Sequence, residues 1–422
     1  MMTRRFARIR RFQFNLPQRI AAGLLAVLLT QGLWLTGHQT LTERDYQYAR
    51  CGREMWERPS HLAGSFTSCG NIHDGILAYR LAGLPLTLYL LAERGLDHFR
   101  KPEDKVVQAD GELSTWELRH QLRYTLLLLR LPFLAAGCLL GAGLWWVTRR
   151  LYGNLGGYTA LGLYCFSPAV LRASVTTSAE VLAALGIYAG VYTCIGVAHA
   201  MMGPRRRWRP RIVLLTAAFG LAAASHIAAL LLVALMGLAA MLWIVEERRS
   251  QTLPVVLIAT AGALVFVFAC YGFSPHAFSY LFRSVPGVLW VSFDTVTRHF
   301  STMGNAGITM AAAAALTSFL GIGNAGITMA AAAALVLFLC LPKSRYFGNM
   351  VPMLCTLVLM VLVMTGVPGS PLLWALPFLL TLIGGVFADA YEGPKGRLAL
   401  GAAGAILLLQ AVFCVLSLPG ML

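Results

Sequence analysis

Long apolar stretches, separated by short polar segments, recur along most of the 422-residue chain. Each stretch has about 20 residues, the length that a helix needs to cross the hydrocarbon core of a bilayer. Inside lipid the backbone must satisfy its own hydrogen bonds, so continuous apolar runs of this kind indicate helices. The pattern predicts an all-α polytopic membrane protein with about 11 transmembrane helices (roughly 10–12) and a large polar loop between the first two.

The expected spans can be placed by residue number. The apolar block 212–245 is too long for one crossing at about 1.5 Å per residue, and it divides most naturally near Ser225 and His226. The other spans cover about 19–36, 124–148, 155–171, 177–201, 253–271, 350–367, 371–388 and 397–418, with one net crossing between 304 and 341.

Composition and charge agree with this pattern. Hydrophobic residues make up 58% of the chain and charged residues 12%, about half of the charged share of a soluble domain. The net charge is +16, but the basic residues gather between the expected spans, as the positive-inside rule requires. The partner that this charge indicates is the lipid bilayer, not nucleic acid. The basic clusters lie at 4–11, 149–150, 205–211, 248–249, 343–345 and 395–397.

Orientation by these clusters divides the chain into regions. No clear small-residue cleavage site follows the first apolar run, so a retained signal anchor is expected, with the N-terminus in the cytoplasm. The alanine, glycine and arginine usage suggests a bacterial cytoplasmic (inner) membrane. The regions are a basic N-terminus (1–18), the anchor (19–37), a periplasmic loop (38–123), a helical core (124–271), a second periplasmic loop (272–303), a duplicated segment (304–341) and the C-terminal spans (350–422).

The duplicated segment is a short tandem repeat. Residues 304–316 read GNAGITMAAAAAL, and residues 323–335 repeat the same letters. Two separate crossings would place the basic cluster at 343–345 outside, so one net crossing with a break at 321–323 is favoured. Twelve spans remain the alternative, and the repeat can equally be a recent duplication without function.

The first periplasmic loop is the chemically richest part of the chain. It holds 12 of the 18 acidic residues, and its segments 42–56 and 76–91 have the mixed polarity of helices that lie on a membrane surface. Cys51 and Cys69 share this loop, where an oxidising compartment would allow a disulfide. The other cysteines fall in apolar spans without metal-ligand spacing, so no metal site is expected.

Glu180 is the carboxylate that lies well within an expected span, close to its outer end. A carboxylate inside the membrane is a functional candidate by default. Alternatively, Glu180 pairs with Arg130 or Arg172 for structure alone. With the acid-rich loop, it predicts a site that faces outward.

Residues 130–181, RLPFLAAGCLLGAGLWWVTRRLYGNLGGYTALGLYCFSPAVLRASVTTSAEV, resemble the second-to-fourth-span region of GT-C membrane glycosyltransferases. The branch most like it is that of the protein mannosyltransferases and aminoarabinose transferases (glycosyltransferase family 39). The matching features are RLP at the start of span two, RRLYGNLGG at the cytoplasmic turn, SP at the outer end of span three and a carboxylate soon after. AAASHIAAL and SPLLWALPFLLTLIGG fit as well.

The resemblance implies a GT-C fold and sugar transfer, with inversion, from a polyprenyl-phosphate-linked donor on the outer face. It implies no cofactor, although some GT-C enzymes use a divalent cation. A carboxylate of the first outer loop serves as general base in this family, which points to Asp45. Glu43 is the alternative, because the family usually has two adjacent acids here. Both can also be solvated acids on a surface helix.

The resemblance also suggests roles in substrate binding. Glu180 stands where the family often has an aspartate, and it could orient an arginine or the acceptor. His226 stands where the family often has a lysine and could contact the donor phosphate, as could arginines of the second outer loop. A buried, hydrogen-bonded histidine is the alternative for His226. The substrate-binding candidates are His73, Asp74, Arg130, Arg172, His226, Arg283 and Arg298.

Two other functions compete with catalysis. The departures from the family pattern favour a non-catalytic GT-C-like subunit of a larger membrane complex: no adjacent acid pair, and histidine where lysine is usual. A transporter is less favoured, because transporters place broken helices and ionisable residues near the midplane. The sugar, the acceptor and any complex partners are not specified by the sequence.

Overall fold

The computed structural model describes residues 15–57, 72, 75–97, 122–202, 209–245, 249–281, 324–340, 346–363, 371–393 and 396–422. In these residues the regular structure is helical, without a strand. The helices include α1 (Leu16–His38), α2 (Glu43–Glu57), α4 (Ile76–Asp97), α6 (Leu122–Cys165), α7 (Pro168–Val175), α8 (Glu180–Met202), α9 (Arg209–Ser225), α10 (Ile227–Ile244), α11 (Arg249–Cys270), α14 (Ala325–Cys340), α15 (Tyr346–Val363), α16 (Pro371–Glu392), α17 (Gly396–Ser417) and the 3-10 helix η4 (Pro419–Met421).

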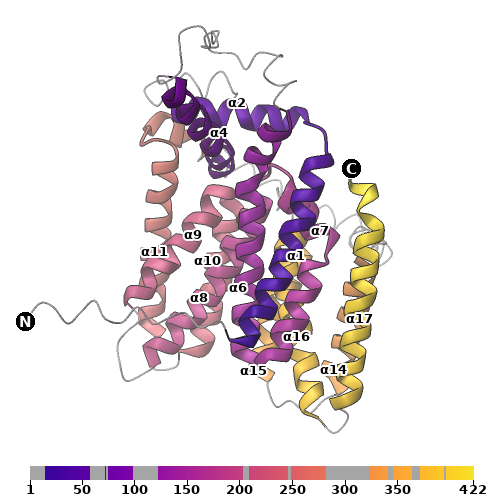
Figure 1. Cartoon of the computed structure of the whole chain (residues 1–422). Coiled ribbons are helices and arrows are strands. Elements are labelled where there is room, and N and C mark those ends of the chain that lie inside the picture. Colours follow the sequence, from indigo (N-terminus) through magenta and orange to yellow (C-terminus); the bar gives the residue numbers. More distant parts are fainter. Residues whose placement is uncertain are drawn as a thin grey trace, which may run out of the picture.

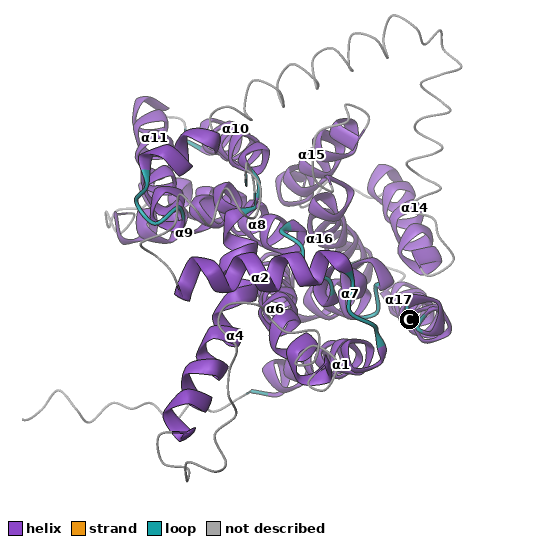
Figure 2. Cartoon of the chain, turned by 90° about the horizontal axis from the view of Figure 1, so that it is seen from above, coloured by secondary structure: helices purple, strands orange, loops and turns teal. Residues whose placement is uncertain are grey.

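The long helices form a bundle, and α2 lies across one end of it (Figure 1). We call this end the α2 end. Seen from above, α6, α8 and α16 occupy the middle, with α9, α10 and α11 on one side and α1, α14 and α17 on the other (Figure 2). The apolar window of α16 is 83% buried within the protein and that of α17 only 17%. Helix α16 therefore forms the core, and α17 lies at the periphery.

The chain is an integral membrane protein with an all-α fold. Seven described helices are long and apolar enough to cross a membrane, and four shorter apolar helices accompany them. Helix α6 contains two of the expected spans, because the chain changes direction inside it at Gly153, which has φ 81° and ψ −172°. Glycine adopts a positive φ at little steric cost. The count of 11 spans stays a prediction.

The end of the third span differs from the expectation. We expected one helix over 155–171, but α6 ends at Cys165 and the short helix α7 begins at Pro168. Proline restricts the preceding residue to extended conformations, and Ser167 has φ −88° and ψ 115°. The Ser167 hydroxyl then accepts a hydrogen bond from the Val170 amide at 3.5 Å, which caps α7. The SP pair thus ends one helix and starts another.

The two helices of the first loop cross at very close range. A Cβ atom on Gly83 would lie 2.1 Å from the carbonyl carbon of Gly52, so the α2 and α4 backbones touch. Beside the crossing, the rings of Tyr48 and Tyr79 stack with their centroids 4.1 Å apart. Trp56 of α2 donates its indole N–H to the Arg80 carbonyl of α4 at 2.8 Å. Helices α2 and α4 therefore pack as one unit.

The second copy of the repeat forms helix α14, and the first copy lies outside the described residues. Gln410 of α17 makes two hydrogen bonds, one to the start of α14 and one to the residue after α6. Its side-chain oxygen accepts from the Ile327 amide at 3.0 Å, and its side-chain nitrogen donates to the Phe166 carbonyl at 2.8 Å. A buried polar side chain thus joins α6, α14 and α17.

Candidate functional site

Asp45 lies on the inner side of α2, facing the bundle, and only 2% of it is exposed. One carboxylate oxygen accepts a hydrogen bond from Arg130 of α6 at 2.6 Å. The same oxygen accepts from the Thr42 hydroxyl at 2.8 Å and the Thr42 amide at 3.1 Å. The other oxygen accepts from the Thr177 hydroxyl at 2.6 Å. Asp45 thus joins α2 to α6 and to the turn before α8.

These contacts decide the charge of Asp45. Burial raises the pKa of its carboxyl, but the hydrogen bonds from Arg130 and Thr177 and the positive charge of Arg130 lower it more. The net result is a pKa below the usual value of 3.8. Asp45 is therefore an ionised but weakly basic carboxylate.

Arg130 extends this cluster to the end of the chain. It is 3% exposed and donates a second hydrogen bond, at 2.6 Å, to the side-chain oxygen of Gln39. Gln39 in turn donates to the Met421 carbonyl of η4 at 2.7 Å. We define the Asp45–Arg130 cluster as Asp45, Arg130, Gln39, Met421, Thr42 and Thr177. It therefore links four segments that are far apart in the sequence.

A second cluster is built around Glu180, the first residue of α8. One carboxylate oxygen of Glu180 lies 3.4 Å from the His226 Nε2 atom, an ion pair when His226 is protonated. The other accepts a hydrogen bond from the Trp374 indole N–H at 3.1 Å. The rings of His226 and Trp374 lie 5.6 Å apart. We call these three residues the Glu180–His226 cluster.

The sequence around His226 explains its position. His226 has extended backbone angles, φ −150° and ψ 128°, and it is the N-cap residue of α10. The break between α9 and α10 therefore falls where the length of the apolar block predicted it. The side chains of Glu180 and His226 are 18% and 15% exposed, so this cluster is more accessible than Asp45.

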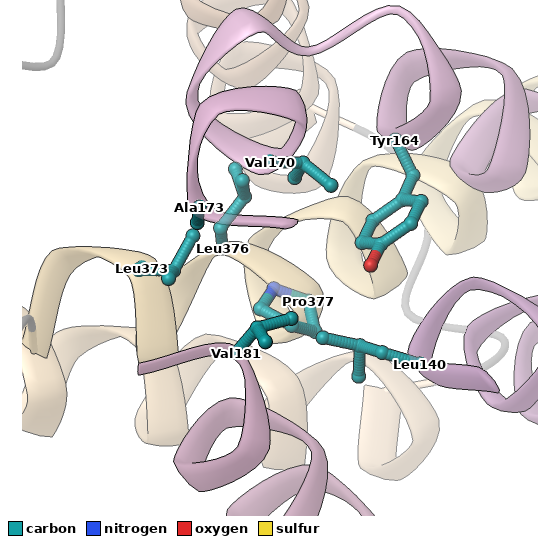
Figure 3. A pocket seen from close by; sticks show the side chains of 8 residues that line it. All are labelled: Leu140, Tyr164, Val170, Ala173, Val181, Leu373, Leu376 and Pro377. Atoms are coloured by element: carbon teal, nitrogen blue, oxygen red, sulfur yellow. The ribbon is translucent and has the colours of Figure 1, made fainter. Parts of the chain in front are cut away.

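Both clusters are attached to one turn. Thr177 of the first cluster and Glu180 of the second flank the short connection between α7 and α8. A small cavity lies beside this turn, enclosed by α6, α7, α8 and α16 (Figure 3). Its volume is only about 10 Å³, and its lining, which includes Val181 and Leu373, is apolar apart from the Tyr164 hydroxyl. That hydroxyl donates to the Gly137 carbonyl at 2.7 Å, so the cavity is part of the core and not a substrate pocket.

The remaining sequence candidates lie outside these two clusters or outside the described residues. Glu43 is exposed on α2, and Arg172 is exposed on α7. Cys51 is buried and disulfide-bonded. Its pairing with Cys69 stays a prediction, because Cys69 lies outside the described residues. His73, Asp74, Arg283 and Arg298 also lie outside them.

One interpretation of the sequence paired Glu180 with Arg130 or Arg172, but Arg130 is bound to Asp45, and Glu180 contacts His226 and Trp374. Sequence reasoning also missed Thr177, Gln39 and Trp374. Trp374 stands in the SPLLWALP segment that carried part of the family resemblance, which was the one available signal. Among the described residues, no group of three histidine, cysteine or acidic side chains lies close enough together to hold a metal ion.

Comparison with protein-family models and with curated proteins finds no match to the sequence. Two solved structures are similar. The crystal structure of the Archaeoglobus fulgidus oligosaccharyltransferase in complex with Zn and sulfate has a TM-score of 0.54 and 13% identity, and the match covers 93% of this chain and 52% of that one. The archaeal oligosaccharyltransferase AglB from Archaeoglobus fulgidus, in complex with an inhibitory peptide and a dolichol-phosphate, has a TM-score of 0.50 and 12% identity, over 93% and 55% of the two chains.

At these identities the likeness is one of fold. The oligosaccharyltransferases are GT-C enzymes, so this chain has the fold of GT-C membrane glycosyltransferases. The resemblance found in the sequence is thereby confirmed at the level of the fold. The chain spans about half the length of the two structures that it matches.

Proposed function

We propose that this chain is a membrane glycosyltransferase. It transfers a sugar, with inversion, from a polyprenyl-phosphate-linked donor to an acceptor on the periplasmic side of the bacterial inner membrane. The observation that carries the proposal is the attachment of two carboxylate clusters to one turn beneath α2, in a bundle with the GT-C fold. The complex of AglB with a dolichol-phosphate supports a donor of this chemical class.

The Glu180–His226 cluster suits the donor side of the reaction. A protonated imidazole donates well to a phosphate oxygen, and such charge-assisted hydrogen bonds are strong. In an inverting displacement the base and the leaving group stand on opposite sides of the anomeric carbon. Glu180 and His226 lie 3.4 Å apart, which leaves no room for a sugar between them. Glu180 therefore positions His226, and the base comes from elsewhere.

Asp45 is the base in this proposal. It takes the proton of the acceptor group after that group displaces one of its threonine partners, Thr42 or Thr177. The acceptor atom then forms a bond to the anomeric carbon, and the bond from that carbon to the phosphate oxygen breaks. The electron pair leaves with the polyprenyl phosphate. Glu43, exposed two residues earlier on α2, is the alternative base.

One observation favours a second function, a non-catalytic subunit of a membrane complex. The Asp45 carboxylate is buried and bonded to three side chains. This is the environment of a residue that holds a structure together, and a base with a depressed pKa accepts protons poorly. The two functions make opposite predictions for the same variants.

The test is sugar transfer by the purified chain from a polyprenyl-phosphate-linked donor, compared for wild type, Asp45→Asn, Glu43→Gln and Glu180→Gln. Catalysis predicts loss of transfer in Asp45→Asn, with Glu43→Gln close to wild type and the same elution from gel filtration. Transfer that survives Asp45→Asn and Glu43→Gln combined would overturn the base assignment. A stable complex with unrelated subunits, and no transfer by any variant or the wild type, would support the second function.

A further inference from the structure

A larger cavity is lined by residues near the start of α17, and α17 begins at the end of the bundle opposite α2 (Figure 1). Its volume is about 370 Å³, within the range of small-molecule binding sites. It lies where the α6 chain turns at Gly153, between that turn, the end of α16 and the start of α17. The lining residues are Tyr152, Gly153, Asn154, Leu155, Tyr158, Ala388, Tyr391, Glu392 and Leu400. None of them belongs to the two clusters at the α2 end.

The polar part of this lining suits a cation. Three tyrosines and one carboxylate, Glu392, are among the lining residues. The Tyr152 hydroxyl already donates to the Gly348 carbonyl at 2.5 Å, and Tyr152 is 3% exposed, which leaves Tyr158 and Tyr391 as the accessible rings. Aromatic faces attract ammonium groups, and a carboxylate strengthens that attraction. A ligand that is only an anion would be repelled by the negative charge of Glu392.

Two arginines closely precede the lining residues along the chain, and one of them contacts the lining. Arg149 donates to the side-chain oxygen of Asn154, a lining residue, at 2.9 Å. The guanidinium of Arg149 lies 5.1 Å from the centroid of the Trp145 ring, and Arg150 lies 5.4 Å from that of Trp146. Tryptophan and arginine gather at the level of the lipid headgroups. The cavity is therefore expected at that level, with Arg149 at its rim and with tyrosines and a carboxylate in its lining.

Exposed apolar side chains flank the lining residues along the chain. Leu151, Leu398 and Leu400 are 41%, 70% and 47% exposed. In a membrane protein, such side chains contact acyl chains. Exposed apolar side chains, arginines and a cation-attracting lining thus occur together at this end of the bundle, and they match the three parts of a zwitterionic phospholipid.

We propose that this cavity binds the headgroup of an ammonium-bearing phospholipid such as phosphatidylethanolamine. The ammonium lies against Glu392 and the rings of Tyr158 and Tyr391. The phosphate lies at the rim beside Arg149 and Arg150. The proposal is independent of sugar transfer, because it concerns the opposite end of the bundle and holds for an enzyme or an accessory subunit.

The experiment is native mass spectrometry of the full-length chain in detergent, after delipidation and addition of equal amounts of phosphatidylethanolamine and phosphatidylglycerol. Wild type is expected to retain the ethanolamine lipid about fivefold better, the factor that corresponds to about 1 kcal/mol. In Glu392→Gln and in Tyr391→Leu this preference falls to near one. Glu54→Gln, an acid of α2 paired with Arg50, is the matched control and keeps the preference.

Soluble phosphoethanolamine, added at increasing concentration, tests whether the headgroup alone is enough. Competition with the lipid is expected only at far higher concentrations, because the acyl chains supply apolar contact. Equal retention of both lipids by the wild type would overturn the proposal. An unchanged preference in both Glu392→Gln and Tyr391→Leu would do the same.

Discussion

The Asp45–Arg130 cluster and the Glu180–His226 cluster lie at the α2 end, and each joins a carboxylate to a basic side chain. The two clusters differ in their exposure to solvent. Asp45 and Arg130 are 2% and 3% exposed, whereas Glu180 and His226 are 18% and 15% exposed. The Asp45 carboxylate accepts from a guanidinium, two hydroxyls and an amide. Glu180 lies beside an imidazole and an indole, which are weaker partners.

One end of the bundle thus holds both a fixed and an adjustable site. A buried charge must have its partners, because an unpaired one is very costly. The first cluster therefore fixes α2 relative to α6 and the α7–α8 turn. The second has partners that a ligand can replace at small cost, since its groups are partly hydrated. The predictions below separate these two behaviours.

The largest effect is expected from Arg130→Met. It leaves the Asp45 carboxylate buried without its main partner, and breaking a buried pair costs about 3–5 kcal/mol. Thermal unfolding in detergent measures the loss. Arg150→Met, at an exposed position, is the control and should change stability little. Adding Asp45→Asn to Arg130→Met should recover part of the loss, and a double variant that is less stable than the single would contradict the assignment.

Gly83→Ala should have the next largest effect. The new Cβ would lie 2.1 Å from the Gly52 carbonyl carbon, so α2 and α4 must separate. Overpacking of this kind costs about 1–3 kcal/mol. Because α2 carries Asp45, the separation should also make the first cluster as accessible as the second, which hydrogen exchange of the α2 amides would report. Gly23→Ala, with no atom within 4 Å of its Cβ, is the control.

A pH effect of intermediate size should distinguish the clusters. The pKa of Asp45 is lower in the folded protein than its usual value of 3.8. Its stabilisation is therefore complete above that value and is lost as the pH falls through the lower, folded pKa. The difference in melting temperature between wild type and Asp45→Asn should be constant from about pH 7 to 5 and shrink below about pH 4. A difference that grows on acidification would contradict the sign of the shift.

The smallest effect on stability is expected from Glu180→Gln, at most about 1 kcal/mol, because the carboxylate is partly exposed. The effect of Glu180→Gln on the affinity for the donor should be larger than its effect on stability. Without Glu180 to position it, His226 should bind a polyprenyl-phosphate donor about tenfold more weakly, or by about 1.4 kcal/mol. Titration of the donor, with Glu54→Gln as control, measures this. If Glu180→Gln lost as much stability as Arg130→Met, this would contradict the distinction between a fixed and an adjustable cluster.

Much of the fold follows from local patterns. The apolar runs placed most of the helices, and the length of the block 212–245 predicted a break at Ser225 and His226, where α9 ends and α10 begins. The polarity of the first loop predicted α2 and α4. The end of the third span was misplaced, because the pattern of apolar residues gives no sign that proline at 168 forces Ser167 out of the helix.

The site was harder to predict than the fold. The acid-rich loop and the resemblance selected Asp45, Glu180 and His226, and the structure joins two of them in one cluster. No local pattern indicated that Arg130 pairs with Asp45, 85 residues away, or that Trp374 binds Glu180, 194 residues away. Helical periodicity reports which residues lie on one face of one helix, and it carries no information about the neighbouring helix.

The amino-acid sequence is enough to identify an all-α membrane protein, because lipid leaves the backbone few ways to satisfy its hydrogen bonds. It also determined which types of charged group are available near the α2 end. Only the tertiary structure decided which carboxylate is buried and which stays accessible. Burial depends on how α2 lies across the bundle, and that is set by contacts between residues far apart in the chain, such as Gly52 with Gly83 and Gln39 with Met421.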